Sequence, residues 1–178
     1  MALKGDAHTP ESGQARQLLR LACAGEDMVI PVEAVREILE MARLTPIPQS
    51  PDFVMGVMNL RGAVVPVIDL SARFDRGRSP IGRRTAIVIV EIIAMDGSKA
   101  RFTAGLLVDA VYEVLEVPAQ SIEVVPSMGV SVAREFVQGM LNVNGTHALL
   151  LNLQQILATD KLTDMIRVHH QVEEPNVA

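Results

Sequence analysis

The segment FVMGVMNLRGAVVPVIDL, residues 53–70, recurs in the second half of the chain as FVQGMLNVNGTHALLLNL, residues 136–153. The two copies align without a gap, and most positions pair one apolar residue with another. Identical residues stand at Phe53/Phe136, Val54/Val137, Gly56/Gly139, Asn59/Asn142, Gly62/Gly145 and Leu70/Leu153. A second pair of segments, AVREILEM (34–41) and AVYEVLEV (110–117), precedes them in the same order. These matches predict two structural repeats, with an insertion in segment 118–135 of the second.

Turn signals divide both repeats into short apolar runs, which is typical of β-strands. The expected strands are 17–23, 28–32, 35–40, 56–60, 64–69, 85–93, 101–108, 111–117, 139–143 and 148–152. A small open sheet exposes its edges, so we expect each repeat to curl into a closed barrel and the two barrels to share one core. The predicted fold class is therefore all-β. Short helical turns are expected after Pro51, Leu70 and Leu153, the last within a helix-like stretch over 154–168.

The centre of each copy is predicted to be a β-hairpin. In the second copy the turn is Asn144-Gly145, and Asn-Gly is a strong hairpin signal because both residues tolerate positive φ. Gly62 occupies the same place in the first copy, so we assign it a turn role. Arg61 replaces the turn-forming asparagine with a long cation. Two interpretations stay open: a solvated hairpin tip, or a guanidinium that pairs with a partner's carboxylate.

Pro66 lies inside a predicted strand, where the second copy has Leu149. Proline cannot donate to a strand ladder, so this position is expected at a sheet edge or a bulge. An edge would offer a partner a docking surface and a bulge would be structural, and both alternatives stay open. Glu37 recurs as Glu113 in the second repeat, which favours a shared structural carboxylate.

Composition narrows the class of protein. Only 3% of the 178 residues are aromatic, so the core must be built from aliphatic side chains. The formal net charge of −5 argues against nucleic acid as the partner. Cys23 is the only cysteine, which excludes an intramolecular disulfide and fits a reducing cytoplasm. We see no secretory signal and no apolar run long enough for a bilayer, so we expect a soluble protein without direct membrane insertion.

Catalytic and cofactor motifs are missing from the sequence, including the nucleophile elbow, the phosphate-binding loop and the dinucleotide fingerprint. Cys23 lies in an apolar predicted strand and is interpreted as a core residue rather than a nucleophile. The arginine-rich segment 73–84 is interpreted as a solvated linker, the alternative being a surface for phosphate or an acidic partner. We therefore predict a protein-binding module without catalytic residues, cofactor or metal, and a small enzyme of unrecognised type is the competing hypothesis.

The string LTPIPQSPDFVMGVMNLRGAVVPVIDL, with VREI before it and GLLVDAVYEVLEVP after it, resembles the CheW family of chemotaxis coupling proteins. The resemblance runs from about Arg16 to Leu157 and depends most on NLRG followed by VPVIDL. It implies two small five-stranded barrels, similar to Src-homology-3 domains and related by pseudo-twofold symmetry, with a short helix near the C-terminus. It also implies a cytoplasmic adaptor that bridges chemoreceptor tips to the regulatory domain of the histidine kinase CheA. Such an adaptor is a monomer in isolation and alternates with the kinase in the rings of membrane-associated receptor arrays.

The resemblance also assigns partner contacts to positions that match the family's motifs. Val35 and Glu37 of VREI, with Gly56 and Arg61 of GVMNLRG, correspond to positions implicated in receptor and kinase contacts. Apolar residues near Leu44 and Ile47 are expected to contribute to a kinase-facing surface. The full set of predicted partner-binding residues is Val35, Glu37, Leu44, Ile47, Gly56, Asn59, Arg61, Gly62 and Pro66.

We predict a polar N-terminal tail over residues 1–16, a CheW-like domain of two interlocked barrels over 17–168, and a second tail over 169–178. Family members often carry aromatic residues in the first hairpin, where this chain has Leu19, Leu21 and Met28, and this difference is expected to change packing only. Two other functions stay open. The chain could couple receptors in a chemosensory pathway that does not control motility, or occupy arrays without activating a kinase.

Overall fold

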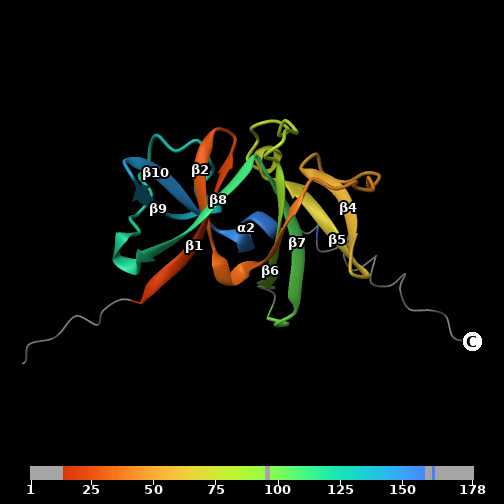
Figure 1. The fold of residues 1–178 in the computed structure, drawn as a ribbon, viewed down its shortest axis with the longest axis horizontal. Helices are drawn as coiled ribbons and strands as arrows, with labels where there is room; N and C mark the ends of the chain where they lie inside the picture. Colours follow the sequence, from red (N-terminus) through yellow and green to blue (C-terminus); the bar gives the residue numbers. More distant parts are fainter. Residues whose placement is uncertain (1–13, 95–96, 159–161, 163–178) are drawn as a thin grey trace, which may run out of the picture.

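Short strands dominate the computed structural model, which describes residues 14–94, 97–158 and 162 (Figure 1). Ten strands follow one another: β1 (Ala15–Cys23), β2 (Glu26–Pro31), β3 (Val35–Glu40), β4 (Val54–Leu60), β5 (Ala63–Asp69), β6 (Ala86–Ile93), β7 (Arg101–Val108), β8 (Ala110–Pro118), β9 (Val137–Val143) and β10 (Thr146–Leu151). All ten expected strands are confirmed, with small shifts of their ends. β1 begins before the predicted end of the N-terminal tail at residue 16. Residues 1–13 and 169–178 of the two predicted tails lie outside the described residues.

Short helices follow the last strand of each repeat. They are α1 (Leu70–Arg73) and α2 (Leu153–Leu157), and single turns of 3₁₀ helix form η1 (Val32–Ala34), η2 (Ala119–Ser121) and η3 (Arg134–Phe136). Asp69 and Asn152 occupy equivalent N-cap positions, and each accepts a hydrogen bond from a backbone N–H of the first turn. The helical turns predicted at α1 and α2 are thus confirmed, whereas the turn after Pro51 is not a helix. Beyond α2, most of the helical stretch predicted up to residue 168 lies outside the described residues.

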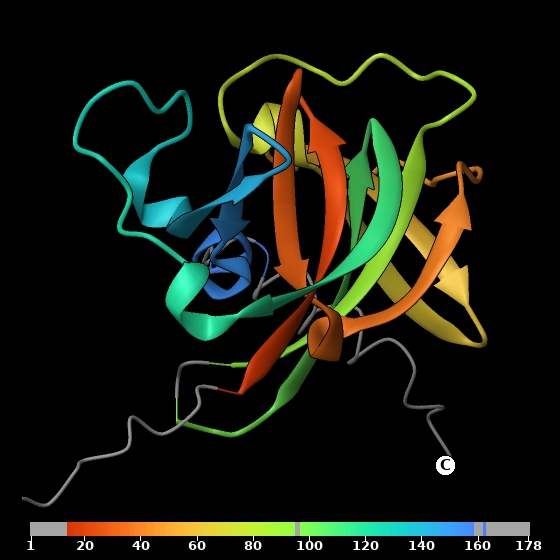
Figure 2. The same ribbon diagram turned by 60° about the vertical axis from the view of Figure 1, so that its left-hand side comes forward.

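The strands form two five-stranded sheets, in the orders β8-β1-β2-β10-β9 and β3-β6-β7-β5-β4. Figures 1 and 2 show the sheets as two bodies that lie side by side, with α2 between them in Figure 1. Each sheet combines strands of both repeats, because β1 and β2 join β8 to β10, while β6 and β7 join β3 to β5. The expectation that each repeat closes on itself is therefore wrong. Apolar periodicity determines which face of a strand is buried but not which strand lies beside it.

Each sheet closes into a barrel through the segment that follows its edge strand. After β3, the N–H of Thr45 donates to the carbonyl oxygen of Val57 at 2.8 Å, and the N–H of Val57 donates back at 2.9 Å. After β8, Glu123 and Met140 exchange the same pair of bonds at 2.7 and 2.9 Å. The two expected barrels are confirmed, and the repeated closure supports their pseudo-twofold relation.

Three apolar clusters fill the molecule. One lies inside the β3–β7 barrel around Ile87 and Ile89, and a second lies inside the other barrel around Leu18. The largest lies between the barrels and includes α2 together with Val88 and Val90. Alternate side chains of β6 therefore enter different clusters, so both faces of this strand are buried. This explains why its sequence reads as a continuous apolar run instead of an alternating one.

Arg73, at the end of α1, joins the two repeats. Its guanidinium lies 4.8 Å from the ring centroid of Phe53 and 4.5 Å from that of Phe136. The carbonyl oxygens of these equivalent phenylalanines accept hydrogen bonds from the N–H groups of Asp69 and Asn152, both at 2.8 Å. Burial between the rings lowers the pKa of Arg73. One side chain of the first repeat thus contacts the same position in both repeats.

Candidate protein-binding surface

The tips of the two central hairpins have the same backbone. In the first, Arg61 has φ 52° and Gly62 has φ 85°, and in the second, Asn144 has φ 51° and Gly145 has φ 84°. Two successive positive φ values are the signature of the type I′ turn, which matches the twist of the strands. The turn role predicted for Gly62 is confirmed.

Asn59 belongs to the same turn. Its Oδ1 accepts a hydrogen bond from the N–H of Gly62 at 3.0 Å, and in the second hairpin Asn142 accepts from Gly145 at 2.8 Å. Both hairpins therefore use the asparagine to close the turn. Asn59 and Gly62 support the surface at the tip, and any contact that they make with a partner stays a prediction.

Arg61 lies at this tip in a conformation that suits asparagine better. A left-handed backbone costs a residue with a long side chain about 1 kcal/mol. The guanidinium Nη2 lies 2.7 Å from Oε2 of Glu37, whose side chain is 20% exposed, while that of Arg61 is 78% exposed. An exposed ion pair contributes at most about 1 kcal/mol, so it offers no clear net gain in stability. The structure brings together two residues that the sequence singled out separately, and most of the Arg61 side chain faces solvent.

In the other barrel, the carboxylate equivalent to Glu37 is Glu113, and it has a different partner. Oε1 of Glu113 lies 2.9 Å from Nη1 of Arg20, an arginine from the neighbouring strand β1. Arg20 also lies 3.1 Å from Asp27 and 4.6 Å from the ring centroid of Tyr112. A backbone hydrogen bond, and then Arg20, hold the pKa of Glu113 below its ordinary value. The hairpin tip of this barrel, at Asn144, carries no cation, so the two barrels present different chemistry at equivalent places.

Gly56 lies where two backbone segments come close together. It has φ 141°, and a Cβ at this position would lie 2.5 Å from the carbonyl oxygen of Thr45. At the equivalent Gly139 a Cβ would lie 2.6 Å from Cγ2 of Ile122. In both repeats, the glycine therefore allows the segment that closes the barrel to pack directly against the strand that carries it. This structural role explains why the glycine recurs, and a contact of Gly56 with a partner stays a prediction.

The remaining predicted contact residues are less exposed. Val35 and Ile47 are partly buried against the shared core, and Leu44 packs in the same way against the inner core of the β3–β7 barrel. Pro66 pairs with β4, and the parallel ladder to β7 begins one residue later, at Val67. β5 is an interior strand between β7 and β4, so Pro66 does not lie in an edge strand; it lies one residue before the ladder to β7 begins, where that side of the strand is unpaired. Its side chain is buried, however, so it offers a partner no exposed surface in the isolated chain.

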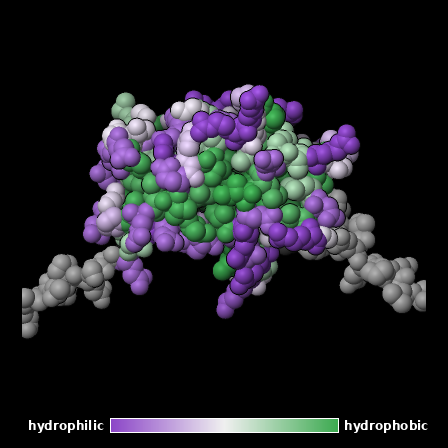
Figure 3. Space-filling model, viewed as in Figure 1, coloured by the Kyte–Doolittle hydropathy of each residue, from purple (hydrophilic) through white to green (hydrophobic). Residues whose placement is uncertain are grey.

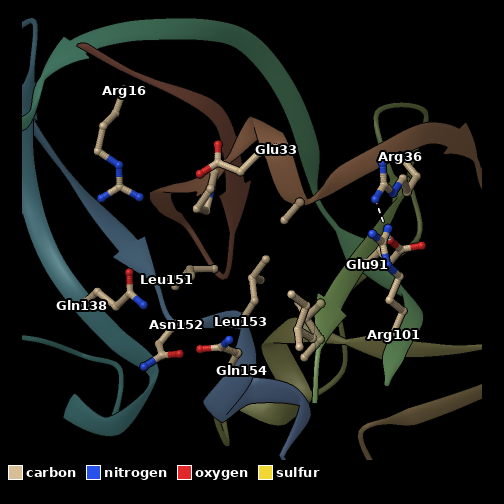
Figure 4. A pocket seen from close by; sticks show the side chains of 14 residues that line it. Arg16, Glu33, Arg36, Glu91, Arg101, Gln138, Leu151, Asn152, Leu153 and Gln154 are labelled. Atoms are coloured by element: carbon tan, nitrogen blue, oxygen red, sulfur yellow. Dashed lines mark hydrogen bonds and ion pairs between the residues drawn. The ribbon is translucent and has the colours of Figure 1, made fainter. Parts of the chain in front are cut away.

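A pocket of about 410 Å³ lies where the two barrels meet (Figure 4). Both barrels and α2 line it, with Leu151 and Leu153 among its apolar side chains. At its edge Glu91 accepts hydrogen bonds from Arg36 at 2.5 Å and from Arg101 at 2.8 Å. These two bonds lower the pKa of Glu91.

Figure 3 shows hydrophobic residues gathered in the middle of the face viewed there and hydrophilic residues around them.

Sequence reasoning missed this pocket. Its lining comes from segments that are far apart in the chain, among them β1, β6, β9 and α2. No local motif marks such a surface. The only signal in the sequence was the VREI segment, which contributes Arg36 to the rim.

Comparisons with known proteins agree with this geometry. The model of the CheW-like domain matches residues 17–161. The chain belongs to the CheW family of chemotaxis adaptor proteins. Among its relatives is the chemotaxis protein CheW of Rhizobium meliloti, 32% identical over 82% of this chain and 90% of that protein. Protein FrzA of Myxococcus xanthus is 33% identical over 73% of this chain and 78% of its own.

A solved CheW-family structure has the same architecture. The crystal structure of the scaffolding protein TtCheW from Thermoanaerobacter tengcongensis superposes with a TM-score of 0.72 at 28% identity. The match covers 89% of this chain and 96% of that one. The family resemblance and the all-β fold predicted from the sequence are therefore confirmed.

The thiol of Cys23 is not accessible at the surface of this CheW-family chain. Cys23 is fully buried in the shared core, and burial raises the pKa of its thiol to about 12, which confirms the core role predicted for it. Within residues 14–94, 97–158 and 162, no group of three or more His, Cys, Asp or Glu side chains is placed to hold a metal ion. In the same part of the chain, no helix has the length and apolar composition needed to cross a membrane.

Proposed function

We propose that the chain couples the cytoplasmic tips of chemoreceptors to the regulatory domain of a CheA-type histidine kinase. The observation that carries this proposal is the exposed Arg61 at the tip of the first hairpin, paired with the partly buried Glu37 of β3. Arg61 occupies a turn position where the second barrel keeps asparagine, and its ion pair gives little stability in return. An arginine at such a position is best explained by a contact that the isolated chain does not make.

The same asymmetry supports a role as a bridge between two proteins. The two barrels share one architecture but differ at equivalent surfaces, with Arg61 on one hairpin tip and Asn144 on the other. A monomer with two related but unequal surfaces can bind two different neighbours. We propose that it works in the cytoplasm, is recruited to receptor arrays, and alternates there with the kinase in rings.

The test is a binding assay with the full chain, a purified kinase regulatory domain and a soluble receptor fragment. Arg61→Ala is expected to keep the fold and to weaken binding to at least one of these partners about tenfold or more. Asn144→Ala is the matched control, because it changes the equivalent tip of the other hairpin. Unchanged binding of the Arg61→Ala protein to both partners would remove Arg61 from the proposed interface.

Two variants of this function stay open. One is a coupling protein of a chemosensory pathway that does not control motility. A chain that occupies arrays without activating the kinase is the other alternative. An assay of kinase autophosphorylation, reconstituted with receptor and with or without the chain, separates activation from occupancy.

A further inference from the structure

The linker between the repeats forms a positively charged surface on an acidic protein. The chain has a formal net charge of −5, yet segment 75–84 contains four exposed arginines and one acidic residue. The arginines are Arg76, Arg78, Arg83 and Arg84. Figure 2 shows this segment in yellow-green, as part of a long arc over one end of the molecule. None of these residues belongs to the hairpin surface of the proposed function.

The segment is anchored by a buried carboxylate. Asp69 is fully buried and accepts hydrogen bonds from the backbone N–H of Ser79 at 2.7 Å and from its hydroxyl at 2.6 Å. Closer to β6, the N–H of Gly82 donates to Oγ1 of Thr85 at 2.8 Å. A buried charge accepts such bonds strongly, so the middle of the segment is tied to the barrel. The arginines on either side of Ser79 are therefore held on a defined frame.

Most of the charge on this frame is not neutralised within the chain. Among the residues that the structure describes, Arg78 and Arg83 have no ion-pair or hydrogen-bond partner. The guanidinium of Arg84 lies 5.1 Å from the ring centroid of Tyr112, and the guanidinium of Arg76 has one hydrogen-bond partner among the described residues, the carbonyl oxygen of Ser131 at 3.5 Å. The guanidinium groups thus keep donors for an external anion.

We propose that segment 75–84 is a docking surface for an acidic segment of a protein partner, with an apolar side chain of that segment seated on Ile81. Ile81 is 54% exposed and stands between Arg78 and Arg83 in the sequence. Guanidinium groups pair with carboxylates through two parallel hydrogen bonds. Such pairs form best when the arginines have defined positions, and the Ser79 anchor fixes the segment that carries them. The segment contains no aromatic residue on which nucleic-acid bases could stack.

The experiment uses the full chain and a fluorescein-labelled peptide of Asp and Glu residues around one central Leu. Binding is followed by fluorescence anisotropy at several salt concentrations. The double variant Arg78→Glu/Arg83→Glu is expected to bind about tenfold or more weakly. The matched control, Arg43→Glu/Lys99→Glu, makes the same charge change at exposed residues outside the segment and is expected to shift affinity less than about twofold.

The apolar contact has its own test. Ile81→Ser is expected to weaken binding of the leucine peptide several-fold and to leave unchanged the binding of a peptide with Ser in place of Leu. An equal effect on both peptides overturns the seat on Ile81. Equal affinity of the wild type and the Arg78→Glu/Arg83→Glu protein overturns the surface itself. Tighter binding to phosphatidylserine vesicles or to duplex DNA than to the peptide, at matched ionic strength, also overturns it. The Arg61→Ala protein is expected to bind the peptide normally, so this test does not depend on the proposed function.

Discussion

Arg73 donates a hydrogen bond from Nε to the carbonyl oxygen of Ile156 at 2.8 Å. Its Nη2 lies 3.4 Å from the carbonyl oxygen of Gln155. Both carbonyls belong to α2, a helix too short to supply them with partners of its own. A side chain of the first repeat therefore completes the helix of the second, while its guanidinium lies between the phenylalanines of both.

Arg73→Ala is expected to destabilise the chain by about 2 kcal/mol, because two carbonyl groups lose their donor and two rings lose a packed cation. Urea denaturation measures the change. Arg73→Lys keeps the charge but not the planar group, and is expected to fall between the wild type and the alanine variant. Arg76→Ala serves as the control at an exposed neighbour and is expected to change stability by less than about 0.5 kcal/mol. A loss of stability no larger than that of the control would show that Arg73 does not hold the repeats together.

Exchanging the residues at the two hairpin tips is expected to change the stability of the chain in opposite directions. Arg61→Asn relieves an unfavourable left-handed conformation and loses a weak ion pair, so stability is expected to stay equal or to rise by about 0.5 kcal/mol. The reverse change, Asn144→Arg, is expected to destabilise by about 0.5–1 kcal/mol. Chemical denaturation of both variants checks the pair. If Arg61→Asn destabilised the chain as much as Asn144→Arg, Arg61 would have a structural role and the argument for a partner contact would lose its basis.

Gly56 provides a test of the barrel closure. Gly56→Ala is expected to cost about 3 kcal/mol or more, because the new Cβ meets a backbone oxygen and the φ of 141° does not suit alanine. Gly82→Ala is the matched control, since a Cβ there meets nothing within 4 Å and the backbone is unstrained. Thermal unfolding of the two proteins should differ clearly. A near-neutral Gly56→Ala variant would contradict the close approach of Thr45 to this glycine.

Glu91 predicts a pH dependence of stability. Its pKa in the folded chain lies below the ordinary value of 4.5, because Arg36 and then Arg101 hydrogen-bond to the charged form. A depressed pKa stabilises the fold above the unfolded-state value, and this contribution is lost as the pH falls through the folded-state value. The difference in thermal midpoint between the wild type and Glu91→Gln should therefore be present at neutral pH and shrink below about pH 4.5. A difference that persists at acid pH would contradict the ion-pair network.

Much of the fold could be predicted because comparing segments 53–70 and 136–153 separates residues that have the same structural role in both copies from residues that differ. Identical residues such as Asn59 and Gly62 serve the same turn twice, and the departure at Arg61 marks a place where the two copies differ in surface chemistry. The exchange of the opening hairpins between sheets could not be predicted, since strand patterns do not name their partners. The same limit applies to the interface between the barrels. Arg73 and Glu91 acquire their roles only when segments far apart in the chain come together.

The exchange of strands also has a consequence for the order in which the chain folds. Met28 of β2 pairs in parallel with Leu149 of β10, so the first hairpin to be synthesised needs a strand from the far end of the chain. Contacts of such high sequence separation slow folding, because a long loop must close before they form. On the ribosome, β1 and β2 emerge early, and their apolar faces stay exposed until β10 is synthesised. The strands β3 to β7 can already pair with one another before that point. The strands of the β3–β7 barrel can therefore pair with one another early, whereas the other barrel and the core between the two barrels are completed only when translation nears its end.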